Sequence, residues 1–255
     1  MKTKSLLIVA LLAMASSVSA QFANTNTSSG GNNMRNIDTN GWQKVYVSYN
    51  PLKMIMDVES ADDVNMTGFS LGYSKGYSIS KDFPLFAEAG IEATYAFNTV
   101  DKEDRKDLET DSNGDLEMKT TYFSVTVPVN LAYKFTLAEK NISIVPYFGV
   151  NLKGNIIGKS KKDFVNFKES YNYDTEKEYW EAAEEDGDRQ ETNWFDKKEA
   201  GSKDAQWKRI QFGWQLGVGL YYNQIYVGVG YSKDFSELCK KTKVSKTSIT
   251  LGYTF

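Results

Sequence analysis

Eight stretches of this chain alternate apolar and polar residues with a period of two. The clearest is the segment 207–222, whose apolar face holds Ile210, Phe212, Trp214, Leu216, Val218, Leu220 and Tyr222. A helix would scatter these residues around its axis, whereas a strand points successive side chains to opposite faces of a sheet. The alternation therefore predicts an all-β protein. The eight expected strands cover residues 43–49, 66–79, 85–97, 119–135, 142–154, 207–222, 225–234 and 244–255.

The length of these segments narrows the fold class further. Strands of globular proteins usually have about 5–6 residues, whereas a tilted strand needs about 9–11 residues to cross a bilayer. Most of the eight segments reach that length, and the aromatic content of 14% suits a protein with Tyr and Trp at both headgroup levels. The pattern predicts an eight-stranded antiparallel up-and-down transmembrane β-barrel, built from residues 42–255.

The connections between the expected strands alternate between long and short. They cover residues 50–65, 80–84, 98–118, 136–141, 155–206, 223–224 and 235–243. In an up-and-down barrel, alternate connections lie at opposite rims, so one rim has tight turns and the other has long loops. Outer-membrane barrels show this asymmetry, with short periplasmic turns and long extracellular loops.

The first twenty residues have the organisation of a secretory signal peptide. Lys2 and Lys4 precede the apolar run 6–15, and Ser17-Val18-Ser19-Ala20 places small residues before Gln21. This pattern predicts export and cleavage after Ala20. Residues 21–41 are rich in Asn, Ser, Thr and Gly, which predicts a flexible leader.

The end of the chain carries a recognisable pattern of apolar and aromatic residues: Ile249, Leu251, Tyr253 and Phe255. It resembles the sorting signal of bacterial outer-membrane β-barrel proteins. The eight segments resemble the small barrels of the OmpA/OmpX type and the outer-membrane protein β-barrel domain group, which includes PorT-like proteins. The resemblance implies residence in the cell outer membrane, contact with its lipid and recognition of the last strand by the barrel-assembly machinery.

A soluble eight-stranded barrel such as a lipocalin is the main structural alternative. That fold places apolar residues inside and polar residues outside, so the period of two cannot separate the two classes. The length of the strands, the strand at the end of the chain and the Gly and Ser on the polar face favour the membrane form.

The face expected to line the lumen carries charges of both signs: Glu88, Glu92, Lys134, Lys153, Arg209 and Lys246. One interpretation is a charged pore or proton path. The other is a closed network of ion pairs, because the interior of eight strands is only wide enough for its own side chains and buried charges must pair. On the same face, Tyr46, Tyr122, Tyr147 and Tyr226 are expected to fill space beside glycines.

The residue composition gives little support for a catalytic site, a metal site or a nucleic-acid site. The chain has no histidine and a single cysteine, Cys239, which excludes Ser-His-Asp and Cys-His sites, imidazole metal sites and Cys-rich zinc sites. Outer-membrane barrel enzymes use histidine, so we expect neither an enzyme nor a cofactor. The run 111–115 resembles part of a calcium loop, but an Asn-Gly pair is more typical of a turn. A net charge of −3 gives no basic footprint for nucleic acid.

The connection 155–206 is charged and unusually aromatic. Its aromatic residues are Phe164, Phe167, Tyr171, Tyr173, Tyr179, Trp180, Trp194 and Phe195. Disordered segments have few aromatics, so part of this loop is expected to fold, as a hairpin extension or a helix around 175–185, or to bind a partner. The last loop is basic, with Lys233, Lys240, Lys241 and Lys243. It is either a contact for outer-leaflet lipid phosphates or a solvated rim.

Three functions agree with these features. The first is a structural or interaction scaffold that displays its loops, above all 155–206, to an extracellular or envelope partner. The second is a channel for small solutes or apolar ligands. The third is an accessory barrel in secretion or envelope assembly, suggested by the resemblance alone.

Overall fold

The computed structural model describes residues 38–57, 63–100, 113–137, 142–170 and 172–255. The expected signal peptide and residues 21–37 of the expected leader lie outside these residues. No helix in the described part of the chain is both long and apolar enough to span a membrane.

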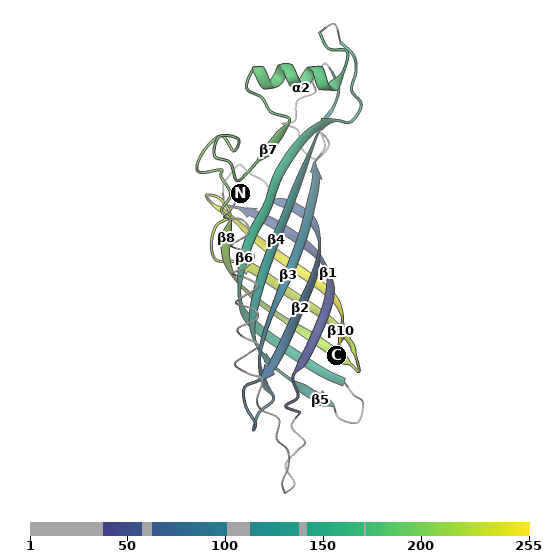
Figure 1. Cartoon of the computed structure of the whole chain (residues 1–255), viewed down its shortest axis with the longest axis vertical. Coiled ribbons are helices and arrows are strands. Elements are labelled where there is room, and N and C mark those ends of the chain that lie inside the picture. Colours follow the sequence, from purple (N-terminus) through teal and green to yellow (C-terminus); the bar gives the residue numbers. More distant parts are fainter. Residues whose placement is uncertain (1–37, 58–62, 101–112, 138–141, 171) are drawn as a thin grey trace.

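Long antiparallel strands dominate the described residues and close into a ring (Figure 1). The eight strands of the ring are β1 (Trp42–Met56), β2 (Val64–Ser78), β3 (Leu85–Val100), β4 (Leu116–Tyr133), β6 (Ile142–Phe164), β8 (Ile210–Tyr222), β9 (Ile225–Asp234) and β10 (Thr242–Thr254). Each pairs with its neighbour in sequence, and β1 pairs with β10. The expected eight-stranded up-and-down barrel is confirmed.

Three further elements lie outside the ring. The short strand β5 (Phe135–Leu137) pairs with the start of β6, and β7 (Glu191–Asn193) pairs with its outer part. Helix α2 (Glu176–Glu185) lies above the barrel at one end, whereas β5 and the C-terminus lie toward the other end (Figure 1). The short turns gather at the end with β5, which is therefore the periplasmic rim, and α2 marks the extracellular end.

The two faces of the barrel wall decide between the membrane and soluble alternatives. On β1, Val47 is 55% exposed, whereas the neighbouring Ser48 is buried. The other strands repeat this arrangement, with apolar side chains outside and polar ones inside. Outward-facing examples are Leu71, Leu131, Phe148, Phe212, Val229 and Leu251. This continuous apolar belt is the surface of a barrel that lies in lipid, so the lipocalin-like alternative is wrong.

Several strands are longer than the alternation predicts. β1 continues through Pro51 to Met56, and β6 continues to Phe164 instead of ending at residue 154. The extension of β6 pairs with the first part of β4, from Leu116↔Phe164 to Phe123↔Ile157. Beyond the bilayer neither face must be apolar, so the alternation fades although the pairing continues. At the start of the segment 207–222, regular strand begins only at Ile210.

Glycines in the wall make room for tyrosines in the lumen. A Cβ on Gly72 would overlap the ring of Tyr46, and one on Gly219 or Gly228 would overlap Tyr226. Gly217 faces the ring of Tyr147 in the same way. The glycines that alternate with apolar residues in the sequence thus leave space for the rings of lumen tyrosines that come mostly from the neighbouring strand, as Tyr46 does beside Gly72 and Tyr147 beside Gly217.

Candidate functional site

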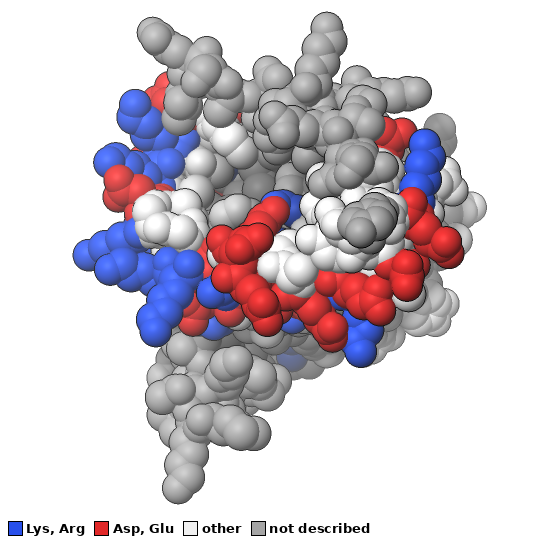
Figure 2. Space-filling model, turned by 90° about the horizontal axis from the view of Figure 1, so that it is seen from above, with Lys and Arg blue, Asp and Glu red and all other residues white. Residues whose placement is uncertain are grey.

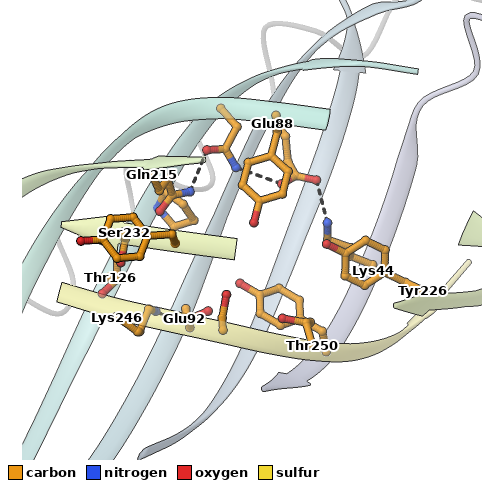
Figure 3. A pocket seen from close by; sticks show the side chains of 15 residues that line it. Lys44, Glu88, Glu92, Thr126, Gln215, Tyr226, Ser232, Lys246 and Thr250 are labelled. Carbon is orange, nitrogen blue, oxygen red and sulfur yellow. Dashed lines mark hydrogen bonds and ion pairs between the residues drawn. The ribbon is translucent and has the colours of Figure 1, made fainter. Parts of the chain in front are cut away.

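The periplasmic half of the lumen is built around the carboxylate of Glu88. This buried side chain, on β3, accepts a hydrogen bond from Nζ of Lys44 on β1 at 2.9 Å (Figure 3). It also accepts from Nε1 of Trp42 at 2.7 Å and from Nδ2 of Asn130 on β4 at 3.1 Å. Nζ of Lys44 lies 4.0 Å from the centre of the Tyr226 ring. Four strands therefore converge on one fully paired charge.

Two further ion pairs lie toward the extracellular side of this centre. Lys246 on β10 pairs with Glu92 on β3, and Glu92 also accepts from Oγ1 of Thr94 at 3.2 Å. Lys153 on β6 pairs with Asp234 on β9 at 2.5 Å. All three carboxylates are buried, and each has a lysine from another strand. This arrangement has the form of the closed network, the second interpretation of the lumen charges.

The six charges expected in the lumen do not all lie there. Glu88, Glu92, Lys153 and Lys246 do, whereas Lys134 follows β4 at the periplasmic rim and pairs with Asp38 at 2.7 Å. Arg209 is outside the lumen: it precedes β8, is exposed and places its guanidinium 4.2 Å from the centre of the Phe195 ring. The expected strand begins at residue 207, whereas β8 begins at Ile210, so Arg209 is not held on the lumen face of a strand.

Two partners in this network were not singled out from the sequence, Lys44 and Asp234. Both have the lumen parity of their strands, since Lys44 precedes the outward-facing Val45 and Asp234 follows Ser232 by two residues. The alternation that places Glu88 and Glu92 on the lumen face therefore also places Lys44 and Asp234 there.

The pair of Asp38 and Lys134 fixes the last part of the leader to the periplasmic rim. Burial opposes ionisation of Asp38, but the hydrogen bond from Lys134 and that from the backbone of Asn40 outweigh it and lower the pKa of the carboxyl. Lys134 also donates to the carbonyl of Asn40 at 3.1 Å. The chain is thus anchored before β1 begins.

The cavities found among the described lumen side chains are small. Two cavities of about 60 and 20 Å³ lie among the lumen side chains, and a cavity needs roughly 10–15 Å³ to hold one water. A cluster of apolar and aromatic side chains fills the periplasmic end: Trp42, Phe86, Ala132, Val145, Tyr221 and Tyr226. Each of the two cavities therefore has room for only a few waters.

A second apolar cluster closes the extracellular end. Its buried members are Leu52, Met54, Met66, Ala96, Tyr122, Phe195, Trp207, Leu238 and Val244. Phe195, Trp207 and Leu238 come from the loops, and we name these three residues the lid. Backbone hydrogen bonds hold the lid together, from Trp207 to Trp194 at 2.8 Å and from Lys208 to Leu238 at 2.6 Å. The longest loop thus folds back over the mouth of the barrel.

Helix α2 begins with a capping box. The Thr175 hydroxyl accepts from the backbone N of Glu178, and the Glu178 carboxylate accepts from the backbone N of Thr175. Trp180, the buried residue of the helix, packs on Phe164 at the tip of β6 with 5.8 Å between ring centres. One oxygen of Glu176 accepts from both Trp180 Nε1 and the backbone N of Phe164. These contacts fix the helix to the end of the β4–β6 hairpin.

Most of the loop aromatics expected to contact a partner are used in packing. Phe164, Trp180 and Phe195 are buried, and those half-buried are Phe167, Tyr173, Tyr179 and Trp194. Tyr171 lies outside the described residues. Trp194 stacks on Trp207 at 5.9 Å and donates to Oγ of Ser160 at 2.8 Å. The part of the loop that faces solvent is instead mostly charged.

Charge is unevenly distributed over the extracellular end. Figure 2 shows acidic side chains in a band across this face and basic side chains gathered to one side. Exposed acidic residues on and after α2 are Glu178, Glu181, Glu184, Glu185, Asp186 and Asp188. Asp188 pairs with Lys162 of β6 at 2.8 Å, and this contact lowers its pKa against the opposing effect of burial. The acidic band is therefore tied to the hairpin beneath it.

Two further sequence motifs are the C-terminal sorting pattern and the possible calcium loop. Ile249, Leu251, Tyr253 and Phe255 all point outward from β10 into the apolar belt. Residues 111–112 of the possible calcium loop lie outside the described residues, and Nδ2 of Asn113 donates to the carbonyl of Lys168 at 3.0 Å. Within the described ranges, no group of three or more His, Cys, Asp or Glu side chains has the arrangement of a metal site.

The closed ring, the outward apolar belt and the paired polar lumen define an eight-stranded outer-membrane β-barrel, with the architecture that the resemblance to OmpA/OmpX-type barrels implies. No family model matches the chain, and no curated protein matches it.

Solved structures of other membrane proteins are similar to the chain. Neisserial surface protein A is 15% identical, with 84% of this chain and 97% of that chain covered and a TM-score of 0.39. Ail of Yersinia pestis, in complex with the heparin analogue sucrose octasulfate, is 15% identical over 84% and 99% of the two chains, with a TM-score of 0.39. The outer membrane enzyme PagL is 12% identical over 80% and 97%, with a TM-score of 0.36.

Proposed function

We propose that this protein is a surface scaffold that holds residues 165–190, the α2 knob, above the outer membrane for contact with a partner. The observation that carries the proposal is the β4–β6 hairpin, which continues with unbroken pairing from Thr121↔Lys159 to Leu116↔Phe164. A paired hairpin is far stiffer than a single-stranded loop, and the knob docks on its open extracellular end through the Trp180–Phe164 contact. The hairpin thus holds the knob in a fixed position above the membrane, where a partner can reach it.

The charge of the knob indicates what kind of surface it contacts. Glu181, Glu184 and Glu185 are exposed on α2, and the helix has no basic residue in its last turn. Complementary charge steers association and rejects partners of like charge. The partner proposed is therefore a protein or polymer with a basic surface, outside the cell or in its envelope.

The first experiment removes this charge without disturbing the cap of the helix. Intact cells that carry the wild type or the variant Glu181→Gln, Glu184→Gln, Glu185→Gln are treated with a crosslinker and compared. The matched control neutralises three acidic residues away from the knob, Asp57→Asn, Asp82→Asn and Glu237→Gln. We expect the crosslinked partner to be lost in the knob variant and kept in the control. Equal capture by all three proteins would contradict the charge-based contact.

A second variant separates presentation from folding. The backbone N of Lys162 donates to the carbonyl of Gln190 at 2.8 Å, so the two ends of the knob are close and a short Gly-Ser linker can replace residues 166–189. The shortened barrel is expected to keep its heat-modifiable migration on gels but to lose capture. A barrel that no longer folds would argue against a separate display role.

The channel remains the rival proposal, and the filled lumen supports the scaffold over it. Planar-bilayer conductance tests this directly: steady conductance that changes on Glu92→Ala or Lys134→Ala would make the channel the favoured function.

The accessory-barrel alternative is distinguished by the identity of the captured partner, which would then be an envelope-assembly component. Catalysis is not part of the proposal, since the sequence lacks the histidine that barrel enzymes use.

A further inference from the structure

A groove of about 800 Å³ lies on the outer wall where β1 meets β10. Its lining includes Tyr49 and Pro51 of β1, Phe97 of β3, Tyr231 of β9 and Thr247 of β10. We name it the seam groove. These residues have the outward parity of their strands, and Tyr49 and Phe97 are 43% and 40% exposed. The outward-facing part of this lining therefore opens toward the membrane, while Tyr231 and Leu52 also border the two cavities of the lumen.

Pro51 accounts for the position of the groove. Proline has no N–H to donate to a neighbouring strand, and the β1–β10 pairing skips from Tyr49↔Ile249 to Leu52↔Lys246. The outward side chains around this gap are small, since Thr67 lies opposite Pro51 on β2 and Thr247 lies on β10. Larger outward side chains, Tyr49 and Ile249, occupy the next row toward the periplasm. The wall is thus locally hollow.

An aromatic row places the groove at the outer interface of the bilayer. Tyr49, Phe69 and Tyr95 are register partners on three adjacent strands, and the rings of Tyr49 and Phe69 lie 5.6 Å apart. Aromatic girdles mark the level of the lipid headgroups. The seam groove adjoins this row on its extracellular side, where an acyl chain ends and a headgroup begins.

Lysines border the groove at the same level. Lys233 of β9 is the register partner of Ser245, which lines the groove, and Lys243 lies two residues further along the same face of β10. Diagonal neighbours on adjacent strands are about 7–8 Å apart, so both ammonium groups can approach one phosphate. Both are half-buried, and neither forms an ion pair within the described residues. Lys53, also on the lining, is already paired with Asp63 at 2.7 Å.

We propose that the seam groove is a specific site for one phosphorylated lipid of the outer leaflet, with an acyl chain against Tyr231 and Thr247 and the phosphate between Lys233 and Lys243. An anionic headgroup satisfies these two lysines, which form no ion pair with any other described residue, and the chain fills the hollow that Pro51 and the small residues leave. A zwitterionic lipid would supply the chain but bring a cation to the lysines. The site lies on the barrel wall and does not depend on the α2 knob.

Native mass spectrometry of the full chain in detergent tests this with phosphatidic acid as the probe and phosphatidylcholine of the same acyl chains as the comparison. The variant Lys233→Gln, Lys243→Gln removes the phosphate contacts. The variant Thr247→Trp fills the groove and keeps both lysines. The control Lys197→Gln, Lys198→Gln removes two exposed lysines from loop 155–206. Heat-modifiable migration verifies that each protein is folded.

We expect one phosphatidic acid to be retained by the wild type and the control. The double-lysine variant should bind it about thirtyfold more weakly, from the loss of two lysines near the headgroup level, and Thr247→Trp should also lose it. Equal retention of phosphatidylcholine, or an equal loss in the control, would overturn the proposal. Retention by Thr247→Trp, or displacement by millimolar inorganic phosphate, would show a phosphate contact without a lipid site and overturn it as well.

Discussion

At the scale of single residues, the lumen shows why its charges are paired. Lys44 and Glu88 are each less than 10% exposed and lie on strands that are not neighbours. A charge in such a place is costly unless a partner and hydrogen bonds accompany it. Trp42 and Asn130 supply those additional bonds to Glu88. The ion pair therefore links β1 and β3, two strands that are not hydrogen-bonded to each other because β2 lies between them.

This pairing gives an asymmetric prediction. Lys44→Met should destabilise the barrel by about 3–5 kcal/mol because it leaves Glu88 buried without a cation, whereas Lys44→Met with Glu88→Met should be nearly neutral. Urea unfolding of the barrel in lipid vesicles, followed by gel migration, measures both. Lys177→Met is the control, since its partner Glu181 is on the exposed face of α2, and should leave the unfolding curve unchanged. A double variant as unstable as the single one would contradict the argument.

At the scale of elements, the α2 helix owes its start to its N-cap. The helix is short, and isolated helices of fewer than about 12–15 residues are marginal in water. Its stability therefore rests on the Thr175–Glu178 capping box and on the packing of Trp180. These are local contacts at the extracellular end of the β4–β6 hairpin, distant from the ion pairs of the lumen.

Removing the cap should loosen the knob alone. Thr175→Ala is expected to cost the helix about 1 kcal/mol, which raises amide hydrogen exchange in residues 176–185 roughly fivefold. Thr175→Ser keeps the hydroxyl and serves as the control. Exchange in β1 and β10 should stay at the wild-type level. If the strands also exchanged faster in Thr175→Ala, the knob and the barrel would be one cooperative unit, contrary to the display proposal.

At the scale of the whole molecule, the barrel follows from the sequence because one physical constraint acts along its full length. Lipid outside and polar side chains inside impose a period of two wherever a strand crosses the bilayer. The aromatic content of loop 155–206 predicts a hairpin extension or a helix around 175–185, and the structure has both. The position at which β6 ends, Phe164, could not be predicted because the constraint imposed by lipid ends at the membrane surface. The lid could not be predicted for a different reason: Phe195 and Trp207 pack on Leu238, and contacts so distant in sequence leave no local pattern.

The position of the lid above the filled lumen limits the effect of removing it. Trp207 and Phe195 cover the mouth, but the ion pairs Lys246–Glu92 and Lys153–Asp234 fill the barrel beneath them. Obstructions in series must all be removed before ions pass. Phe195→Ala with Trp207→Ala should therefore leave the conductance of a planar bilayer at the level of the wild type, although the extracellular end is open.

The conductance measured for the lid variant is compared with that of a control variant, and the folding of both proteins is verified. Phe167→Ala with Tyr179→Ala alters aromatic packing in the knob without touching the mouth of the barrel, and gel migration reports folding for both proteins. Steady current steps in the lid variant alone would mean that the lumen side chains rearrange once the mouth is open. Phe195 and Trp207 would then be a gate, and the channel would replace the scaffold as the function that the barrel best supports.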